Sequence, residues 1–289
     1  MIENLLSLMP VIRSALDEDL GPGDITTNAI IDSEITGLAV LIAREELVLA
    51  GLPVFETVFL EISPRMEFER YFQEGDIVPA GARVCSITGP LSHILKAERT
   101  ALNFLQRMSG IATLTRQYVE KVRPYKAMIL DTRKTAPGIR SFDKYAVRTG
   151  GGLNHRFGLF DGVLIKDNHI VAAGSISRAI QLAKKGVPHT LKIEVEVEDM
   201  AGVEEALQAG ADVILLDNMP PEQMTRAVQL ASGRVMIEAS GGISLDTVTG
   251  VAKCGVDLIS VGALTHSPRA ADFSLEILSK NNEVPPGSA

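Results

Sequence analysis

The chain has 289 residues, of which 46% are hydrophobic and 22% charged, with a formal net charge of −8 and a pI near 5.2. This length suits an α/β barrel with a modest second domain, and the acidic balance argues against nucleic acid or an anionic membrane as the main partner. The two cysteines, Cys85 and Cys254, show neither metal-ligand spacing nor a disulfide framework. We therefore expect both to be small buried residues in a protein of the reducing cytoplasm.

The first predicted element is an amphipathic helix near the N-terminus, where Leu5, Leu8, Ile12 and Leu16 recur at helical spacing. The start of the chain has no basic leader, and no apolar run approaches the roughly 18 residues that span a bilayer. These features predict neither a signal peptide nor a membrane span.

Short apolar runs at 36–43, 65–72 and 84–88 then predict strands separated by turns, so the first part of the chain, to about residue 109, is expected to be mixed α and β. From Ile94 onward, apolar residues at helical intervals predict a long helical region. Gly110 is expected to break it and Pro124 to end it.

After Pro124 the pattern changes to short apolar runs separated by amphipathic stretches, such as 175–185 and 223–231. Repeated βα units of this kind imply a parallel sheet. Their spacing suits a barrel, although a doubly wound open sheet has the same local pattern. The six strand candidates begin at residues 128, 163, 192, 213, 235 and 258.

Chemically capable residues lie at the predicted carboxyl ends of these strands, where α/β barrels build their active sites. Six successive strands ending in this way predict that the residues meet at one mouth. Glycines after the last two strands would let backbone N–H groups approach a phosphate. The strand-end residues are Asp131, Arg133, Lys166, Glu196, Asp217, Glu238 and Gly262.

The segment 130–169 concentrates positive charge in an acidic chain. It carries seven Lys and Arg against four Asp, about +3, so the rest of the chain carries about −11. A merely solvated surface helix is disfavoured, because helix propensity is low in two runs of this segment, Gly150-Gly151-Gly152 and Asn154-His155-Arg156. The segment therefore predicts a pocket for a small, highly charged anion.

This segment resembles the signature of the quinolinate phosphoribosyltransferase family, the decarboxylating nicotinate-nucleotide pyrophosphorylases. Similar blocks follow in order over nearly the whole chain, at 18–27, 98–103, 194–197, 215–218 and 238–243. The resemblance implies an incomplete parallel α/β barrel of fewer than eight strands (110–269) with an N-terminal α/β sandwich domain (1–109), on which 270–289 would pack back.

The resemblance also implies a reaction. Quinolinate would attack the ribosyl carbon of 5-phosphoribosyl 1-diphosphate, and decarboxylation would then give nicotinate mononucleotide, pyrophosphate and CO₂ for NAD biosynthesis, with Mg²⁺ as cofactor. The protein would be a homodimer or a higher homo-oligomer, in which Arg99 is donated across the interface.

By resemblance, the residues divide into two groups that meet at the reaction centre. Lys134, Lys166, Glu196 and Asp217 are the expected catalytic residues, and Glu196 and Asp217 would also hold Mg²⁺, directly or through water. The quinolinate site would contain Arg99, Arg133, Lys134, His155, Arg156 and Lys166. The phosphoribosyl diphosphate site would contain Glu196, Asp217, Ser240, Gly241, Gly242, Gly262 and Ala263.

Several of these residues have structural alternatives. Arg99 could pair with Glu98, and Lys134 could face phosphate or solvent. Glu194 is expected to form a buried ion pair with Lys192 or another barrel cation. His169 could orient Lys166 or cap the next helix. The residues expected to face phosphate or solvent are Arg140, Lys144 and Arg148. No role is assigned to Asp24, Thr26 and Thr27.

Three rival functions remain. A sister family associated with molybdate transport departs from the Lys-Asp-Asn-His pattern that is intact here at 166–169. A silent phosphate-ligand sensor would not need the acids Glu196 and Asp217. A barrel lyase would want a Schiff-base lysine in an apolar setting, whereas Lys166 has charged neighbours. The segment after Asn281 is expected to be a loose tail.

Overall fold

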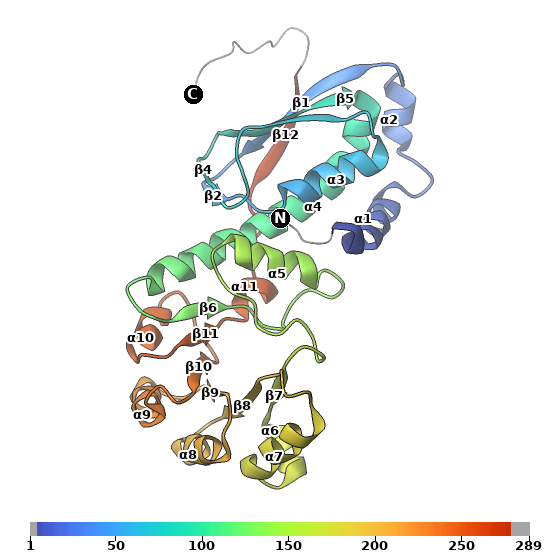
Figure 1. Ribbon diagram of the computed structural model, residues 1–289. Coiled ribbons are helices and arrows are strands. Elements are labelled where there is room, and N and C mark those ends of the chain that lie inside the picture. The colour runs from blue at the N-terminus through green and yellow to red at the C-terminus, as the bar shows by residue number, and fades with distance from the viewer. Residues whose placement is uncertain (1–4, 279–289) are drawn as a thin grey trace. The chain divides into compact units, whose positions relative to one another are not determined.

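The computed structural model describes residues 5–278 (Figure 1). Two compact units divide the chain: unit 1 contains residues 1–113, 137–150 and 268–289, and unit 2 contains 114–136 and 151–267. Segment 137–150, which the sequence assigned to the barrel, thus groups with unit 1, where Arg107 donates both ends of its guanidinium to the buried Asp143 at 2.8 Å. The domain boundaries inferred from the sequence stay a prediction. The segment after Asn281, which was expected to be a loose tail, lies outside the described residues.

Unit 1 is built on an antiparallel sheet of four strands in the order β12-β1-β5-β3. Figure 1 shows α3 running beside this sheet. The strands are β1 (Thr36–Ala43), β3 (Glu67–Arg70), β5 (Arg83–Pro90) and β12 (Phe273–Leu278), with a separate pair β2 (Leu47–Val48) and β4 (Ile77–Val78). The helices are α1 (Leu5–Leu20), α2 (Ile25–Ile30), α3 (Leu52–Ile62), α5 (Arg140–Thr149) and α4 (Leu91–Val122), whose residues are divided between the two units.

The core of unit 1 follows the predicted periodicities. Leu8, Ile12 and Leu16 of α1 are buried, which confirms the amphipathic helix. Phe55 and Phe59, one turn apart on α3, are fully buried with ring centroids 4.9 Å apart.

The expected break of the long helix at Gly110 is wrong, because α4 runs through it without interruption. A Cβ at this position would lie 2.0 Å from the carbonyl oxygen of Arg269. The backbone N–H of Ala271 also bonds the carbonyl of Gln106, one turn earlier, at 2.9 Å. Gly110 therefore permits close packing of another chain segment rather than ending the helix.

Unit 2 contains the six predicted strands in one parallel sheet, in the order β6-β11-β10-β9-β8-β7. They are β6 (Met128–Leu130), β7 (Val163–Ile165), β8 (Ile193–Val197), β9 (Val213–Asp217), β10 (Met236–Ser240) and β11 (Leu258–Ser260). Figure 1 shows the longer helices of this unit along the outer side of the strands. The helices are α6 (Asp167–Ala173), α7 (Ile176–Gly186), α8 (Met200–Ala209), α9 (Pro221–Ala231), α10 (Val248–Lys253) and α11 (Ala263–His266).

The sheet extends beyond β6 by one rudimentary strand. Leu153 forms an isolated parallel bridge with Leu130, and its N–H bonds the carbonyl of Ile129 at 2.8 Å. The segment after Leu153 therefore runs beside β6 toward the carboxyl ends of the strands. The incomplete parallel barrel predicted from the sequence is confirmed.

Alternation along β8 explains how this barrel carries charged groups inside. Ile193, Val195 and Val197 are buried at 0–3% exposure on one face, and Glu194 and Glu196 lie on the other. Glu196 is in register with Leu215 of β9, so Asp217 lies two residues farther along the same face.

Two expectations from composition can also be compared with the structure. Cys85 and Cys254 are both free and buried, as predicted. Among residues 5–278, no helix is both long enough and apolar enough to cross a membrane.

Candidate active site

The carboxyl ends of β7 and β8 are joined by an ion pair. Lys166 follows β7, and its Nζ lies 2.8 Å from Oε2 of Glu196. The lysine side chain is 45% exposed and the glutamate side chain 14% exposed. The pair is therefore open to a ligand from the mouth of the barrel, and the two predicted catalytic residues are in direct contact.

The loops after β9 and β10 interlock beside Asp217. Ser240 is in register with Asp217, and the N–H of Asn218 bonds the carbonyl of Ser240 at 2.9 Å. Asn218 has a φ of 53°, and its Nδ2 lies 3.2 Å from Oδ2 of Asp217. A Cβ at Gly241, whose φ is +96°, would come within 2.2 Å of Oδ1 of Asn218. Asn218 was not among the site residues predicted from the sequence, although its place directly after a strand-end acid was a usable signal.

Lys134 lies against the loop after β11. A Cβ at Gly262 would lie 3.1 Å from Cδ of Lys134, and Oγ1 of Thr265 donates to the carbonyl of Lys134 at 2.9 Å. This contact brings Lys134 to the predicted phosphate residues Gly262 and Ala263. Lys134 is exposed, and the assignment of its ammonium group to phosphate, to quinolinate or to solvent stays a prediction.

Arg156 carries a buried hydrogen-bond donor that lacks an acceptor. Its Nη1 donates to the carbonyl of Gly162 at 3.0 Å, but its Nε is buried without a partner among the described residues. Burial and the nearby positive charge of Arg133 lower the pKa of Arg156. A buried donor beside a second cation is suited to receive an anion.

His155 points into the barrel and contacts two buried acids. Its Nε2 lies 3.0 Å from Oε2 of Glu194 and 3.7 Å from Oε1 of Glu238. Of the expected partners of Glu194, which were Lys192 or another barrel cation, Lys192 precedes β8 and is exposed, and the buried partner is His155. The sequence marked Glu238 only as a strand-end acid, since nothing along the chain shows that it meets Glu194.

The backbone of His155 is held by Asp131, a fully buried residue at the end of β6. Oδ1 of Asp131 accepts the N–H of His155 at 2.9 Å, and Oδ2 accepts from Nδ2 of Asn154 at 2.6 Å. Asp131 therefore anchors the rudimentary strand from which His155 and Arg156 project.

His169 caps α6, one of the two roles that the sequence allowed, and the same contact holds the backbone of Lys166. Its Nδ1 accepts the backbone N–H of Lys166 at 2.9 Å, three residues earlier, at the start of α6. The imidazole thus fixes the backbone of the lysine whose side chain reaches Glu196.

Several other candidates belong to unit 1. Arg99 is exposed on α4, and burial raises the pKa of Glu98 while the charge of Arg99 opposes this rise. Lys144 is only 4% exposed, so the expectation that it faces solvent is wrong. Asp24 caps α2 by accepting the N–H of Thr27 at 2.9 Å, which gives both residues a structural role.

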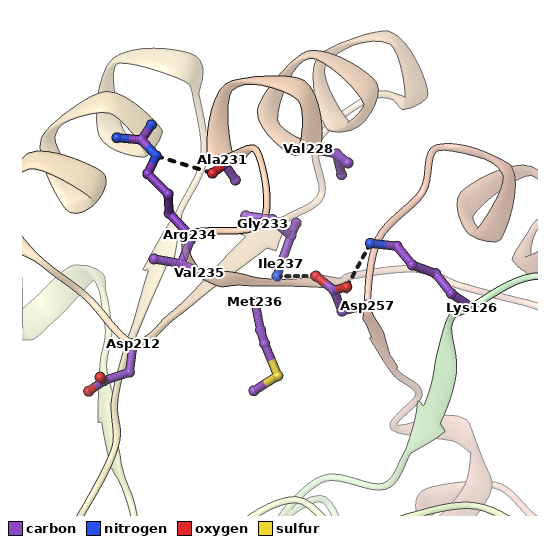
Figure 2. A pocket seen from close by; sticks show the side chains of 10 residues that line it. All are labelled: Lys126, Asp212, Val228, Ala231, Gly233, Arg234, Val235, Met236, Ile237 and Asp257. Carbon is purple, nitrogen blue, oxygen red and sulfur yellow. Dashed lines mark hydrogen bonds and ion pairs between the residues drawn. The ribbon is translucent and has the colours of Figure 1, made fainter.

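A depression of about 240 Å³ in unit 2 lies at the opposite, amino ends of the strands (Figure 2). Its polar groups are occupied in structural contacts: Asp257 bonds Lys126 at 2.7 Å and the N–H of Ile237 at 2.9 Å, and Asp212 accepts the N–H of Ile193 at 2.8 Å. Contacts of this kind at the strand starts stabilise a barrel, whereas its chemistry belongs to the other end.

The carboxyl-end residues form a consistent chemical set. Unit 2 brings together cations (Arg133, Lys134, Arg156, Lys166), acids on adjacent strands (Glu196, Asp217) and glycine-containing loops (240–242, 262–263). Such a set can bind a polyanion with carboxylates placed beside it.

Comparison with known proteins agrees with this arrangement. The family described as "Quinolinate phosphoribosyl transferase, N-terminal domain" matches residues 24–109, and the corresponding C-terminal domain family matches residues 111–276. Together these matches cover most of the chain.

Individual relatives extend the similarity over full lengths. A probable nicotinate-nucleotide pyrophosphorylase [carboxylating] of Bacillus subtilis is 40% identical over 281 residues, 97% of each chain. A quinolinate phosphoribosyltransferase [decarboxylating] of Nicotiana tabacum is 42% identical, covering 93% of this chain and 82% of its own. The solved structure of NadC from Streptococcus pyogenes superimposes with a TM-score of 0.91 at 44% identity, covering 95% of this chain and 98% of that chain. The chain therefore belongs to the quinolinate phosphoribosyltransferase family.

Proposed function

We propose that this protein transfers the phosphoribosyl group of 5-phosphoribosyl 1-diphosphate to quinolinate and releases pyrophosphate, CO₂ and nicotinate mononucleotide. The observation that carries the proposal is the buried Nε of Arg156, which has no hydrogen-bond partner among the described residues and lies near the positive charge of Arg133. The chain that contains this arginine belongs to the quinolinate phosphoribosyltransferase family. Quinolinate has two adjacent carboxylates, and guanidinium groups suit them because their planar N–H donors match carboxylate geometry.

The acid substrate would be held by Arg133, Arg156 and Lys166. Each charged hydrogen bond of this kind contributes about 1.5–3 kcal/mol. Because Lys166 already pairs with Glu196 at 2.8 Å, binding of the acid would place quinolinate next to the carboxylate that faces the ribose. Positioning of this kind supports attack by the ring nitrogen without a general base, since that nitrogen carries its own lone pair.

The phosphoribosyl donor would occupy the loops after β10 and β11, with Lys134 beside them. Lys134 contacts Gly262 through its aliphatic chain, which leaves its ammonium group available for a phosphate at this end of the barrel. Glu196 and Asp217 would stabilise positive charge that develops on the ribose as the bond to pyrophosphate breaks.

The acids Glu196 and Asp217 also fit magnesium. They present carboxylate oxygens on one face of neighbouring strands, two residues apart in the register. Mg²⁺ prefers oxygen ligands and takes few of them from protein. When bound, Mg²⁺ would neutralise diphosphate charge.

The loss of CO₂ follows from the substrate itself. Once the ring nitrogen is joined to ribose it is positively charged, so it stabilises the electron pair left at C2 when the adjacent carboxylate leaves as CO₂. That electron pair then takes up one proton from solvent, which gives the C2–H bond of nicotinate mononucleotide. The cations around the acid need only hold the ring in place during this step.

We also propose a cytoplasmic homodimer or larger homo-oligomer in which Arg99 of a second copy completes the acid site. The exposure of Arg99 on α4 supports this assignment, because an exposed guanidinium can reach a ligand bound by another chain. The two free, buried thiols are in keeping with a reducing compartment.

Product analysis tests the function directly. Purified protein would be incubated with quinolinate, 5-phosphoribosyl 1-diphosphate and Mg²⁺, with nicotinate in a parallel reaction. We expect nicotinate mononucleotide and one equivalent of CO₂ from quinolinate and no product from nicotinate. Folded, metal-loaded protein that converts neither acid would overturn the proposal in favour of the sister family or a silent binder.

A further inference from the structure

Asn218 has a backbone conformation that L-amino acids rarely adopt. Its φ is 53°, in the left-handed region, and among residues 5–278 the only other non-glycine residue with a positive φ is Ser232. Ser232 ends helix α9, where a left-handed residue is common. Asn218 follows strand β9 at the mouth of the barrel and ends no helix. The strain at Asn218 therefore has its explanation in the site rather than in the secondary structure.

The side chain of Asn218 is the feature to be explained, because a glycine would adopt this backbone conformation without strain. Asn218 is exposed, so packing in the core is not the reason for its presence. Its backbone N–H bonds the carbonyl of Ser240 at 2.9 Å, but any residue other than proline would make that bond. The contacts that only asparagine supplies are those of its amide group.

The amide of Asn218 holds the carboxylate of Asp217. Nδ2 donates to Oδ2 of Asp217 at 3.2 Å, and this is the one hydrogen bond that the carboxylate makes within the described part of the chain. An amide NH₂ group donates and a carboxylate accepts, which fixes the orientation of the amide. Asn218 therefore restricts rotation of the carboxylate and sets the direction of its other oxygen, Oδ1.

The oxygen of the same amide lies against the backbone of Gly241. A Cβ at Gly241 would lie 2.2 Å from Oδ1 of Asn218, and one at Gly242 would lie 4.0 Å from it. Both glycines are left-handed, with φ of +96° and +59°. The missing side chain at Gly241 therefore makes room for the amide, and the amide in turn limits movement of the Gly241-Gly242 turn.

We propose that Asn218 is a positioning residue for phosphoribosyl transfer, whose amide joins the carboxylate of Asp217 to the Gly241-Gly242 turn. The inference rests on the proposed function, which assigns both groups to the phosphoribosyl donor. One side chain thus sets the spacing between the acid that would face the ribose and the turn that would take phosphate. A bound donor would cover the amide and the carboxylate, and their hydrogen bond becomes stronger when water is excluded.

Asn218→Gly removes the amide and keeps the left-handed backbone. We expect kcat to fall about tenfold and the KM for 5-phosphoribosyl 1-diphosphate to rise about as much, because a hydrogen bond to a charged group is lost. The KM for quinolinate should change less than about twofold, since no contact with the acid is removed. Ser232→Gly, at the other left-handed non-glycine position, is the matched control and should leave the kinetics unchanged. Unchanged kinetics in Asn218→Gly would make Asn218 a turn residue only and overturn the proposal.

Asn218→Asp separates the donor from the shape of the side chain. Aspartate visits the left-handed region as asparagine does and has nearly the same size, but it presents a second carboxylate to Asp217 in place of a donor. We expect kcat to fall more than in Asn218→Gly. A smaller fall would mean that shape is what Asn218 provides, and the assigned role of its bond to Asp217 would be wrong.

Ligand binding gives a readout that needs neither metal nor catalysis. Titration calorimetry would be done in buffer containing a chelator, with nicotinate mononucleotide, which carries a ribose phosphate, and with quinolinate, which does not. The Kd for nicotinate mononucleotide should rise about tenfold in Asn218→Gly, whereas the Kd for quinolinate should stay the same. Equal affinities of the native protein and Asn218→Gly for the nucleotide would overturn the proposal. Native protein that binds neither ligand and forms no product would instead overturn the proposed function.

A double-mutant cycle tests the contact with Gly241 without any ligand, so it stays informative if the proposed function is wrong. Gly241→Ala should lower the midpoint of urea unfolding more in the native background than in Asn218→Gly, because removal of the amide makes room for the methyl group. Gly233→Ala is the control, since a Cβ there has nothing within 4 Å, and it should have the same effect in both backgrounds. An effect of Gly241→Ala that is also the same in both would show that the amide does not restrain the turn, and would overturn the proposal.

Discussion

Lys166 and Glu196 form a 2.8 Å ion pair that joins the carboxyl ends of β7 and β8. The lysine is exposed enough to meet a substrate carboxylate, and the more buried glutamate lies on the strand face that also carries Asp217. One contact thus connects the group that would bind the acid with the group that would face the ribose. Mutations can therefore test the acid-binding part and the ribose-facing part of the site separately.

Replacing Glu196 by Gln should reduce kcat about a hundredfold to a thousandfold, because a preorganised negative charge beside the developing ribose cation is lost. The KM for quinolinate should change much less. Steady-state kinetics with each substrate varied, repeated over a range of Mg²⁺ concentrations, checks the prediction. A quinolinate KM that rises as much as kcat falls would place Glu196 in the acid pocket instead.

Arg133→Ala should raise the KM for quinolinate about tenfold to a hundredfold through loss of a charged hydrogen bond. The KM for 5-phosphoribosyl 1-diphosphate should remain near its native value. Arg226→Ala, at an exposed position of α9, is the matched control for removing an arginine from the same unit. The reverse pattern of KM changes would mean that the two substrate pockets have been interchanged.

Mixing two impaired proteins, assayed at a quinolinate concentration far below their KM, tests whether Arg99 acts across an interface. Arg99→Ala and Arg133→Ala, denatured together and refolded, should regain partial activity, because some hybrid dimers contain one site with both arginines intact. Mass spectrometry would verify that subunits have exchanged. Verified exchange without recovery would place Arg99 in its own subunit's site or outside any site.

The parallel barrel was predictable because its signal is local. Each strand is a short apolar run, and the βα rhythm repeats six times, so the strands at 128–130 through 258–260 follow from periodicity alone. The position of an acid at the end of a strand is equally local, which is why Glu196 and Asp217 were identified as neighbours on one edge.

Contacts between distant segments were not predictable from these patterns. Gly110 has the appearance of a helix breaker, and only the approach of Arg269 explains why the helix continues through it. Glu194 was expected to pair with Lys192, two residues away, or with another barrel cation, and its partner is His155, which is 39 positions away along the chain. Periodicity assigns a residue to a face of a strand but not to its partner across the barrel.

Gly241→Ala should destabilise the protein more than an ordinary glycine replacement. At a φ of +96° a side chain is strained, and its Cβ would also lie 2.2 Å from Oδ1 of Asn218. Gly233→Ala is the matched control, since Gly233 has a φ of +74° and nothing within 4 Å of a Cβ. We expect the control to cost about 1 kcal/mol and Gly241→Ala at least about 1 kcal/mol more, measured by urea unfolding. Equal losses would mean that Asn218 moves aside freely.

The raised pKa of Glu238 should make the free energy of unfolding depend on pH. The folded pKa of Glu238 is raised to about 8 from an ordinary value of 4.5, so the folded state binds more protons than the unfolded state between these values. The stabilising contribution of the protonated group is fully present below pH 4.5 and is lost as the pH rises through about 8.

The free energy of unfolding of the native protein, relative to Glu238→Gln, should therefore fall as the pH is raised across this window. A fall of at least about 1.4 kcal/mol corresponds to one pKa unit. Urea unfolding of both proteins at a series of pH values measures the difference and cancels the contributions of the other groups. A difference that grows with pH would contradict the raised pKa of Glu238.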